Sequence, residues 1–237
     1  MKDIVDITVT QVRVYPTDSL PFADLRRADN VKTLKERFHF ESVHIDPLGL
    51  QMTFNNGTFD HRGKSLHIVS LTVEQRRVLI QARGRSSMAD AVYAAFSSIL
   101  ANIPGRAKSN KFEPLLKGEE TACVVTLDID FDDLIAPPLL RFIQTEGKAK
   151  LRTEFGSPKS VAFKNLSFEV RYGLASPQLE EHDVTLSNKL ITIEPRLATP
   201  LRERRFYTSS PTDSETHLAM LEALEKEVAK FHAGKNK

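Results

Sequence analysis

The sequence predicts an α+β protein in which a mostly antiparallel sheet carries helices on one face. Two observations support this prediction. Short strand-like segments follow one another without intervening helices, which favours an antiparallel sheet over a doubly wound parallel one. Each half of the chain then closes with one amphipathic helix, expected over residues 87–103 and 212–232.

The same order of elements fills residues 3–103 and 121–232, which suggests an internal duplication. Leu34 and Phe38 align with Leu151 and Phe155 at a constant shift. We therefore expect two similar sheet-plus-helix lobes joined by a polar linker. Their layout is similar to saddle-like folds, in which two such repeats share one curved sheet, although no residue motif points to a family. The expected division is lobe 1–105, linker 106–120 and lobe 121–237.

Alternating apolar residues define the strands of the first half. The alternation changes phase after Val9, which indicates a β-bulge near Gln11. Asn56-Gly57 predicts a hairpin turn, because both residues tolerate positive φ. Residues 20–38 mix apolar and basic side chains and are read as a short helix or an irregular connector. The strands expected in this half span residues 4–15, 38–45, 50–54, 58–60, 66–73 and 77–82.

Capping signals mark both closing helices. Ser87 and Asp90 match an S-x-x-D capping box, and Pro104-Gly105 stops the first helix. Thr212 and Glu215 form the corresponding box of the last helix. The second half is expected to contain strands over residues 122–131, 160–172 and 190–193, a short helix over 137–143 and an extended segment over 194–211.

Composition places the chain among ordinary globular proteins. Hydrophobic residues make up 41% and charged residues 27% of its 237 residues, which is enough for a sizeable core. The single cysteine, Cys123, excludes an intramolecular disulfide and is read as a small buried hydrophobe rather than a nucleophile. No apolar run approaches the ~20 residues that cross a bilayer, and the first residues lack a secretory signal. We expect a cytoplasmic protein without a membrane partner.

The sequence contains none of the motifs we sought for catalysis or cofactor binding. There is no glycine-rich phosphate loop, no G-x-S-x-G elbow, no H-E-x-x-H and no Cys/His spacing for a metal. We name no catalytic residue and expect no cofactor, so the sequence leans away from an enzyme. The net charge of +2 is far from the strong basicity of a dedicated nucleic-acid-binding domain.

One acidic pattern is a candidate metal site. Asp128, Asp130 and Asp132 alternate with apolar residues, so we expect them to project from one face of a strand. Carboxylates in this arrangement can hold Mg²⁺ for phosphoryl transfer. The competing interpretation is a solvated acidic strand edge.

Two basic groups are candidate contacts for nucleic acid or a protein partner. Arginine beside aromatic rings can clamp phosphates and stack on bases, and arginine and tyrosine are also frequent at protein interfaces. The third interpretation is a solvated strand edge. The residues are Arg76, Arg77, Arg83 and Arg85 in the first half, and Arg202, Arg204, Arg205, Phe206 and Tyr207 in the second.

These observations favour a non-enzymatic binding or assembly protein, which acts through self-association or as a subunit of a larger protein complex. A duplicated antiparallel sheet offers long edges and a broad face for such contacts. Two alternatives stay open. The first is a nucleic-acid-binding module that uses the arginine-rich strand edges. The second is a Mg²⁺-dependent phosphoryl-transfer enzyme built on the aspartate strand.

Overall fold

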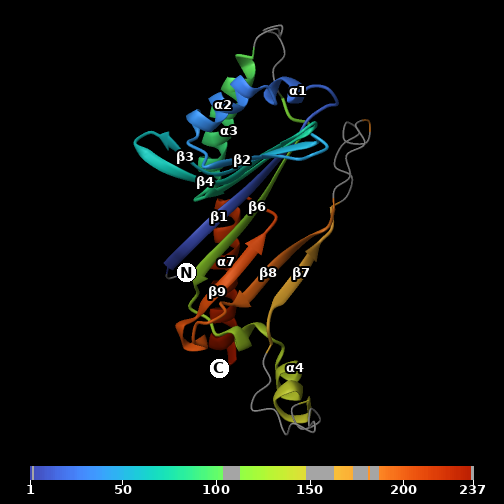
Figure 1. The fold of residues 1–237 in the computed structure, drawn as a ribbon. Coiled ribbons are helices and arrows are strands. Elements are labelled where there is room, and N and C mark those ends of the chain that lie inside the picture. Colours follow the sequence, from blue (N-terminus) through green and yellow to red (C-terminus); the bar gives the residue numbers. More distant parts are fainter. Residues whose placement is uncertain (2, 104–112, 148–162, 173–180, 182–186, 236–237) are drawn as a thin grey trace, which may run out of the picture.

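The protein is an α+β structure built on one antiparallel sheet of nine strands (Figure 1). The computed structural model describes residues 1, 3–103, 113–147, 163–172, 181 and 187–235. The strand order is β2-β3-β4-β5-β1-β6-β9-β8-β7. The sheet twists strongly, so that β2, β3 and β4 are seen nearly edge-on in Figure 1 while β7, β8 and β9 face the viewer. The predicted α+β class and antiparallel sheet are therefore confirmed.

The elements have the following bounds. The strands are β1 (Asp3–Val14), β2 (Ser42–Ile45), β3 (Gln51–His61), β4 (Lys64–Glu74), β5 (Arg77–Arg83), β6 (Leu116–Thr126), β7 (Leu166–Val170), β8 (Lys189–Pro195) and β9 (Arg205–Ser210). The α-helices are α1 (Phe22–Leu25), α2 (Ala28–Arg37), α3 (Ser86–Ala101), α4 (Pro137–Phe142) and α7 (Ser214–Lys235). Shorter helical turns are η1 (Phe131–Leu134), η2 (Ile143–Gly147) and η3 (Leu201–Glu203).

The long strands β1 and β6 form the centre of the sheet. They pair antiparallel from Asp3 opposite Thr126 to Val14 opposite Leu116. The register shifts between Ile4 and Asp6, so the bulge expected near Gln11 is wrong in position. The apolar alternation changes phase for another reason: the inward positions after Val9 are occupied by polar side chains. These side chains, Gln11 and Arg13, are buried.

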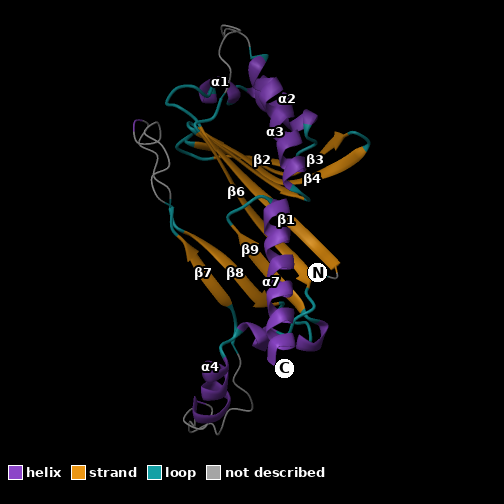
Figure 2. Ribbon diagram, turned by 180° about the vertical axis from the view of Figure 1, so that it is seen from behind, coloured by secondary structure: helices purple, strands orange, loops and turns teal. Residues whose placement is uncertain are grey.

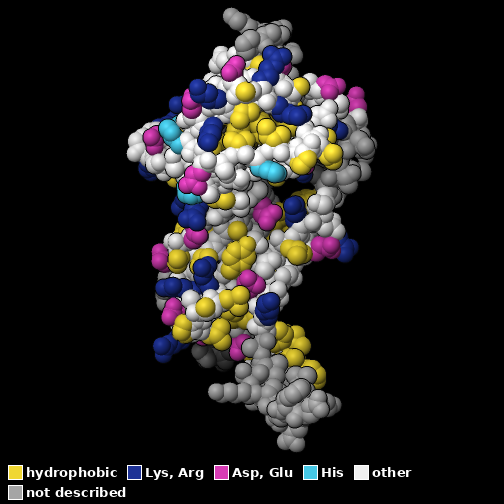
Figure 3. All heavy atoms as spheres, in the orientation of Figure 1, with side chains coloured by type: hydrophobic (Ala, Val, Ile, Leu, Met, Phe, Trp, Pro, Cys, Tyr) yellow, Lys and Arg dark blue, Asp and Glu magenta, His cyan; other side chains and the backbone are white. Residues whose placement is uncertain are grey.

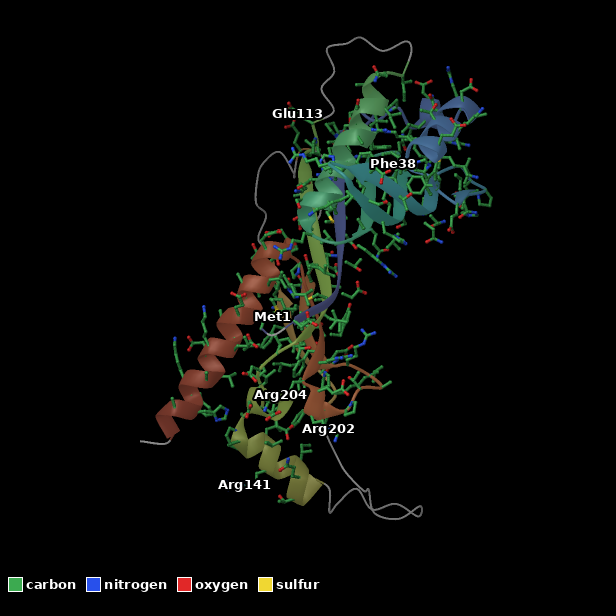
Figure 4. All side chains as sticks on the ribbon, turned by 90° about the vertical axis from the view of Figure 1, so that its left-hand side faces the viewer. Met1, Phe38, Glu113, Arg141, Arg202 and Arg204 are labelled. Atoms are coloured by element: carbon green, nitrogen blue, oxygen red, sulfur yellow. The ribbon has the colours of Figure 1, made fainter. Side chains whose placement is uncertain are left out.

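The long helices pack against one face of the sheet. In Figure 2, α3 and α7 lie in front of the strands, and the side view of Figure 4 places both on the same side of the central strands. Helices α1, α2 and α3 share a core with β1 and β3–β5 that includes Leu34, Phe38, Phe54, Ile80 and Phe96. Helix α7 covers a second core, on β6, β8 and β9, that includes Cys123, Val125, Phe206, Leu218 and Leu221.

The N-termini of α3 and α7 meet and cap each other. The backbone N–H of Ser86 donates to Oγ of Ser214, and the N–H of Ser214 donates to Oγ of Ser86, each at 2.9 Å. Both serines are buried, so each hydroxyl satisfies an N–H that water does not reach. The capping box expected at Ser87 is wrong, because α3 has no side-chain cap of its own and Asp90 bonds to other elements.

The last helix also starts differently from the expectation. Helix α7 begins at Ser214, and the carboxylate of Asp213 accepts the backbone N–H of Thr216 at 2.9 Å. Asp213 therefore caps the first turn, in place of the expected Thr212. The hydrogen bonds of Asp213 to this turn lower the pKa of its carboxyl.

The hairpin expected at Asn56-Gly57 is wrong. Strand β3 runs through both residues, and its turn to β4 lies at Arg62 and Gly63, which both have positive φ. Gly57 serves close packing instead, since a Cβ there would lie 2.5 Å from the ring of Phe40.

Other boundaries agree with the expectations in part. The connector over residues 20–38 contains α1 and α2, and the short helix expected at 137–143 is α4. Strand β6 begins at Leu116, so the end of the expected linker belongs to the sheet, while residues 106–112 lie outside the described residues. The aligned positions Leu151 and Phe155 also lie outside them, and the division into domains stays a prediction. No helix among the described ranges is both long and apolar enough to span a bilayer.

Replacing either linked serine should destabilise the protein. Ser86→Ala and Ser214→Ala each leave one buried N–H without its acceptor, so we expect each to lower the free energy of unfolding by about 1–2 kcal/mol. Urea denaturation followed by circular dichroism measures the change. The matched control is Ser87→Ala, which removes an exposed hydroxyl and should change stability by less than about 0.5 kcal/mol. A larger loss at Ser87 than at Ser86 would contradict this assignment.

Candidate interaction face of the sheet

The face of the sheet opposite α3 and α7 is not covered by any helix among the described residues (Figures 1 and 2). Side chains alternate along a strand, so the strand registers and the buried residues assign each position to one face. Thr8, for example, pairs with Arg83 on one side and Ala122 on the other, while the neighbouring Val9 is fully buried in the core. Thr8, Arg83 and Ala122 therefore lie on the uncovered face.

Short uncharged side chains dominate the middle of this uncovered face. They are β-branched, small or neutral polar residues, and most are neither fully buried nor fully exposed. The set comprises Thr8, Thr10, Val12 and Val14 on β1, Gly118, Ala122, Val124 and Thr126 on β6, Leu79 and Gln81 on β5, Ser70 and Thr72 on β4, Ser209 on β9 and Thr192 on β8.

The charged residues of the uncovered face are mostly acidic. Strand positions on this face carry seven carboxylates and three arginines. Two further cations reach its carboxylates, Arg171 to Glu169 at 2.7 Å and Lys189 to Glu120 at 3.7 Å, so the formal charge is −2. The lower part of Figure 3 shows acidic and basic side chains scattered over this face without a continuous basic field. The carboxylates are Asp3, Asp6, Asp60, Glu74, Glu120, Glu169 and Glu194, and the arginines are Arg77, Arg83 and Arg205.

Tyr207 lies within this acidic part of the face. It pairs with Val124 on one side and Glu194 on the other, and Val124 pairs in turn with Asp6. Asp6, Val124, Tyr207 and Glu194 thus form one row across four strands. Burial raises the pKa of the Tyr207 phenol, and the charges of Glu120 and Glu194 raise it further. The ring is 36% exposed, so it remains open to contact.

The first-half arginines do not form one patch. Arg77 pairs with Glu74 at 2.6 Å, Arg85 lies 3.8 Å from Glu215 of α7, and Nε of Arg76 donates to the carbonyl of Tyr15. Arg83 lies at the end of β5 opposite to Arg77. Most of this predicted group therefore serves contacts within the protein.

The structure joins two groups that the sequence assigned to different functions. Arg204 donates to Asp130 at 2.9 and 3.1 Å and to Asp128 at 2.8 Å. Hydrogen bonding to Asp130, and then its charge and that of Asp128, raise the pKa of Arg204. Arg202 and Arg204 lie at the α4 end of the molecule, far from Phe38 (Figure 4). This pairing ties the loop before β9 to the segment after β6.

The aspartates do not lie on a strand, so that expectation is wrong. Strand β6 ends at Thr126, and Asp130 caps η1 together with Asp133, whose carboxylate accepts the N–H of Asp130 at 3.1 Å. Asp132 is an exposed residue within this turn. Across the described ranges, no three His, Cys, Asp or Glu side chains come together in a way that could hold a metal ion. Metal binding at Asp128, Asp130 and Asp132 stays a prediction.

The remaining predicted residues separate onto opposite faces. Phe206 is buried against Phe131 with ring centroids 6.2 Å apart, so it is not available to stack on a ligand. Tyr207 faces the other way. Arg205 lies on the uncovered face, with Nε 3.6 Å from Glu203.

Two small cavities lie near η1. One, of about 370 Å³, is lined by Ile135, Leu140, Phe231 and His232, whose Nε2 lies 3.1 Å from the carboxylate of Asp133. The other, of about 200 Å³, lies between Phe131, Pro200, Arg202 and Arg204.

A charged cluster links β1, β6 and α3, with Arg13 buried and with Asp90 and Lys117 partly exposed. Arg13 donates to Asp90 at 2.7 Å and lies 3.5 Å from the ring centre of Tyr93, while Lys117 reaches the same carboxylate at 2.9 Å. Burial alone would raise the pKa of Asp90, but hydrogen bonds and charge from Lys117, with Gln11 and Arg13, hold it below its usual value. Lys117 also pairs with Glu119 at 3.1 Å, so two cations face two carboxylates and the cluster fixes α3 to the sheet.

A second buried polar chain links β6, β9 and α7. His217 is bonded to Thr208 at Nε2 and to Ser210 at Nδ1, at 2.8 and 2.7 Å, and Thr208 also contacts the Cys123 thiol at 3.1 Å. Burial raises the pKa of Cys123. Cys123 is buried as expected, and its thiol stays protonated near neutral pH.

Tyr207 is among the residues predicted from the sequence, but the carboxylates around it are not. Asp6 precedes half-buried Ile7 on β1, Glu120 precedes buried Thr121 on β6, and Glu194 follows buried Ile193. The strand pattern of the sequence therefore indicates that each carboxylate faces away from the core. Only the pairing of β1, β6, β9 and β8 shows that the carboxylates lie close together. A scan against protein-family models finds no match, and a search of curated proteins finds no significant relative.

Acidification should destabilise the protein through His217. Burial lowers its pKa from 6.5 to about 4, so the unfolded chain binds a proton at a pH where the folded protein does not. Stability should fall as the pH drops from about 6.5 to about 4, by roughly 2–3 kcal/mol.

The variant His217→Gln tests this assignment, since glutamine can bond to both hydroxyls without titrating. Urea denaturation at several pH values should show a smaller loss of stability on acidification in the variant than in the wild type. Equal losses would rule out His217 as the source.

Proposed function

We propose that the protein is a non-enzymatic binding protein that acts as a subunit of a larger protein complex through its uncovered sheet face. One observation carries the proposal: a nine-stranded sheet has its helices on one face, and most side chains in the middle of the other face are uncharged. The centre of a protein interface is depleted in charge, while its rim is polar.

The composition of the face supports a protein partner over bulk solvent. Antiparallel sheets often leave one face to water, and polar side chains then line it. Here strand β1 contributes the half-buried apolar side chains Val12 and Val14, which gain from being covered. Tyr207 adds an exposed aromatic ring of the kind that anchors interfaces.

We also propose that the two halves arose by duplication. In both halves the first long strand lies at the centre of the sheet, and the later strands lie beside it in reverse order toward the edge. From β1 the order is β5, β4 and β3, and from β6 it is β9, β8 and β7. The closing helices α3 and α7 meet at Ser86 and Ser214 with matching reciprocal bonds. Under this proposal the repeats place their uncovered faces side by side and double the contact area available to one partner.

A charge inserted in the middle of the face should release the partner. Ala122 lies between Thr8 and Ser209, so Ala122→Arg places a long cation on the proposed contact surface. We expect the tagged wild type, isolated from its source cells, to elute as a complex heavier than the 26.7 kDa monomer by light scattering. The variant should elute as the monomer.

The matched control is Ala223→Arg, which makes the same change at an exposed position of α7. It should retain the complex, and both variants should keep the wild-type circular dichroism spectrum. A wild type that is monomeric in extracts, or a complex that survives Ala122→Arg, would reject the proposed function.

A further inference from the structure

We propose that the partner presents a basic segment, which places a lysine or arginine side chain over Tyr207 between Asp6, Glu120 and Glu194. This inference rests on the proposed function and specifies the chemistry of its partner. It follows from the position of one exposed ring among carboxylates on an uncovered face.

The strand geometry lets a cation of the partner reach the Tyr207 ring from the uncovered face. Asp6, Val124, Tyr207 and Glu194 form one row, and the next row consists of Thr8, Ala122, Ser209 and Thr192. These neighbours are short and uncharged, so they leave space beside the ring. A cation within about 6 Å of a ring centre is attracted by the negative face of the ring.

The electrostatic field around Tyr207 favours a cation. Glu120 and Glu194 raise the pKa of its phenol, because negative charge nearby opposes a phenolate. Asp6 and Glu194 have no ion-pair partner in the described part of the chain, and Lys189 reaches only Glu120 at 3.7 Å. Arg205 lies one row away beside Glu203. Two carboxylates thus remain for a cation that the partner supplies.

The same charges disfavour two other occupants. A second copy of this chain would bring a face of formal charge −2 against an identical face. Nucleic acid would bring phosphates against the same carboxylates, whereas nucleic-acid-binding surfaces are basic. A basic protein segment matches both the uncharged middle of the face and its acidic residues.

Two synthetic peptides test the inference directly. The first is Lys-Thr-Val-Lys-Thr-Val-Lys, and the second replaces each lysine with glutamate. We expect the lysine peptide to bind with a Kd below about 1 mM and to shift the ¹H–¹⁵N resonances of Val124, Tyr207 and Glu194. The glutamate peptide should not bind.

Variants separate the ring from the carboxylates. Asp6→Asn with Glu194→Gln should weaken the lysine peptide at least about tenfold, and Tyr207→Ala about threefold or more. Tyr207→Phe keeps the ring and should retain most of the affinity. The control Glu222→Gln removes one exposed carboxylate from α7 and should leave the affinity unchanged.

Several results would overturn the inference: no binding of the lysine peptide at about 1 mM, equal binding of the glutamate peptide, resonance shifts confined to other surfaces, tighter binding of a double-stranded DNA oligonucleotide, or dimerisation through this face. If Ala122→Arg still releases the partner from the native complex in any of these cases, only the basic character of the partner is rejected. If the complex survives Ala122→Arg, the proposed function itself is rejected.

Discussion

The pairing of β1 with β6 is the interaction on which the rest of the structure depends. Eleven residue pairs join strands that lie more than a hundred positions apart in the sequence, and they turn two groups of strands into one sheet. The seam also carries the charged cluster that holds α3, because Arg13 comes from β1 and Lys117 from β6. A second link crosses at the helix ends, where Ser86 and Ser214 cap each other.

In this arrangement the long helices cover one side of the sheet, and no helix of the described ranges covers the other side. Both long helices start near the seam and run away from each other along the same face (Figure 2). Core residues such as Ile80 and Val125 therefore point toward helices, while their strand neighbours point away. Thr10, Ala122 and Tyr207 are placed side by side by strand pairing, so the candidate face follows directly from the fold.

Sequence patterns were reliable where one physical effect dominated. The helical period of Val92, Phe96 and Leu100 predicts α3, and the alternation of apolar residues predicts the central strands. Sequence patterns failed where tertiary contacts replaced a local rule. Gly57 meets the ring of Phe40 instead of making a turn, and Asp90 bonds to β1 and β6 instead of capping a helix. Because Arg204 comes from a distant loop, its pairing with Asp128 and Asp130 could not be read from local spacing.

Hydroxyl-radical footprinting of the native complex against the free protein tests the central claim most directly. Tyr207 lies on the uncovered face and Met220 on α7, and the two side chains are 36% and 38% exposed, so they give matched reporters on opposite sides of the sheet. If the uncovered face binds the partner, oxidation of Tyr207 should fall in the complex while that of Met220 stays unchanged. Protection of Met220 with Tyr207 still reactive would contradict the account.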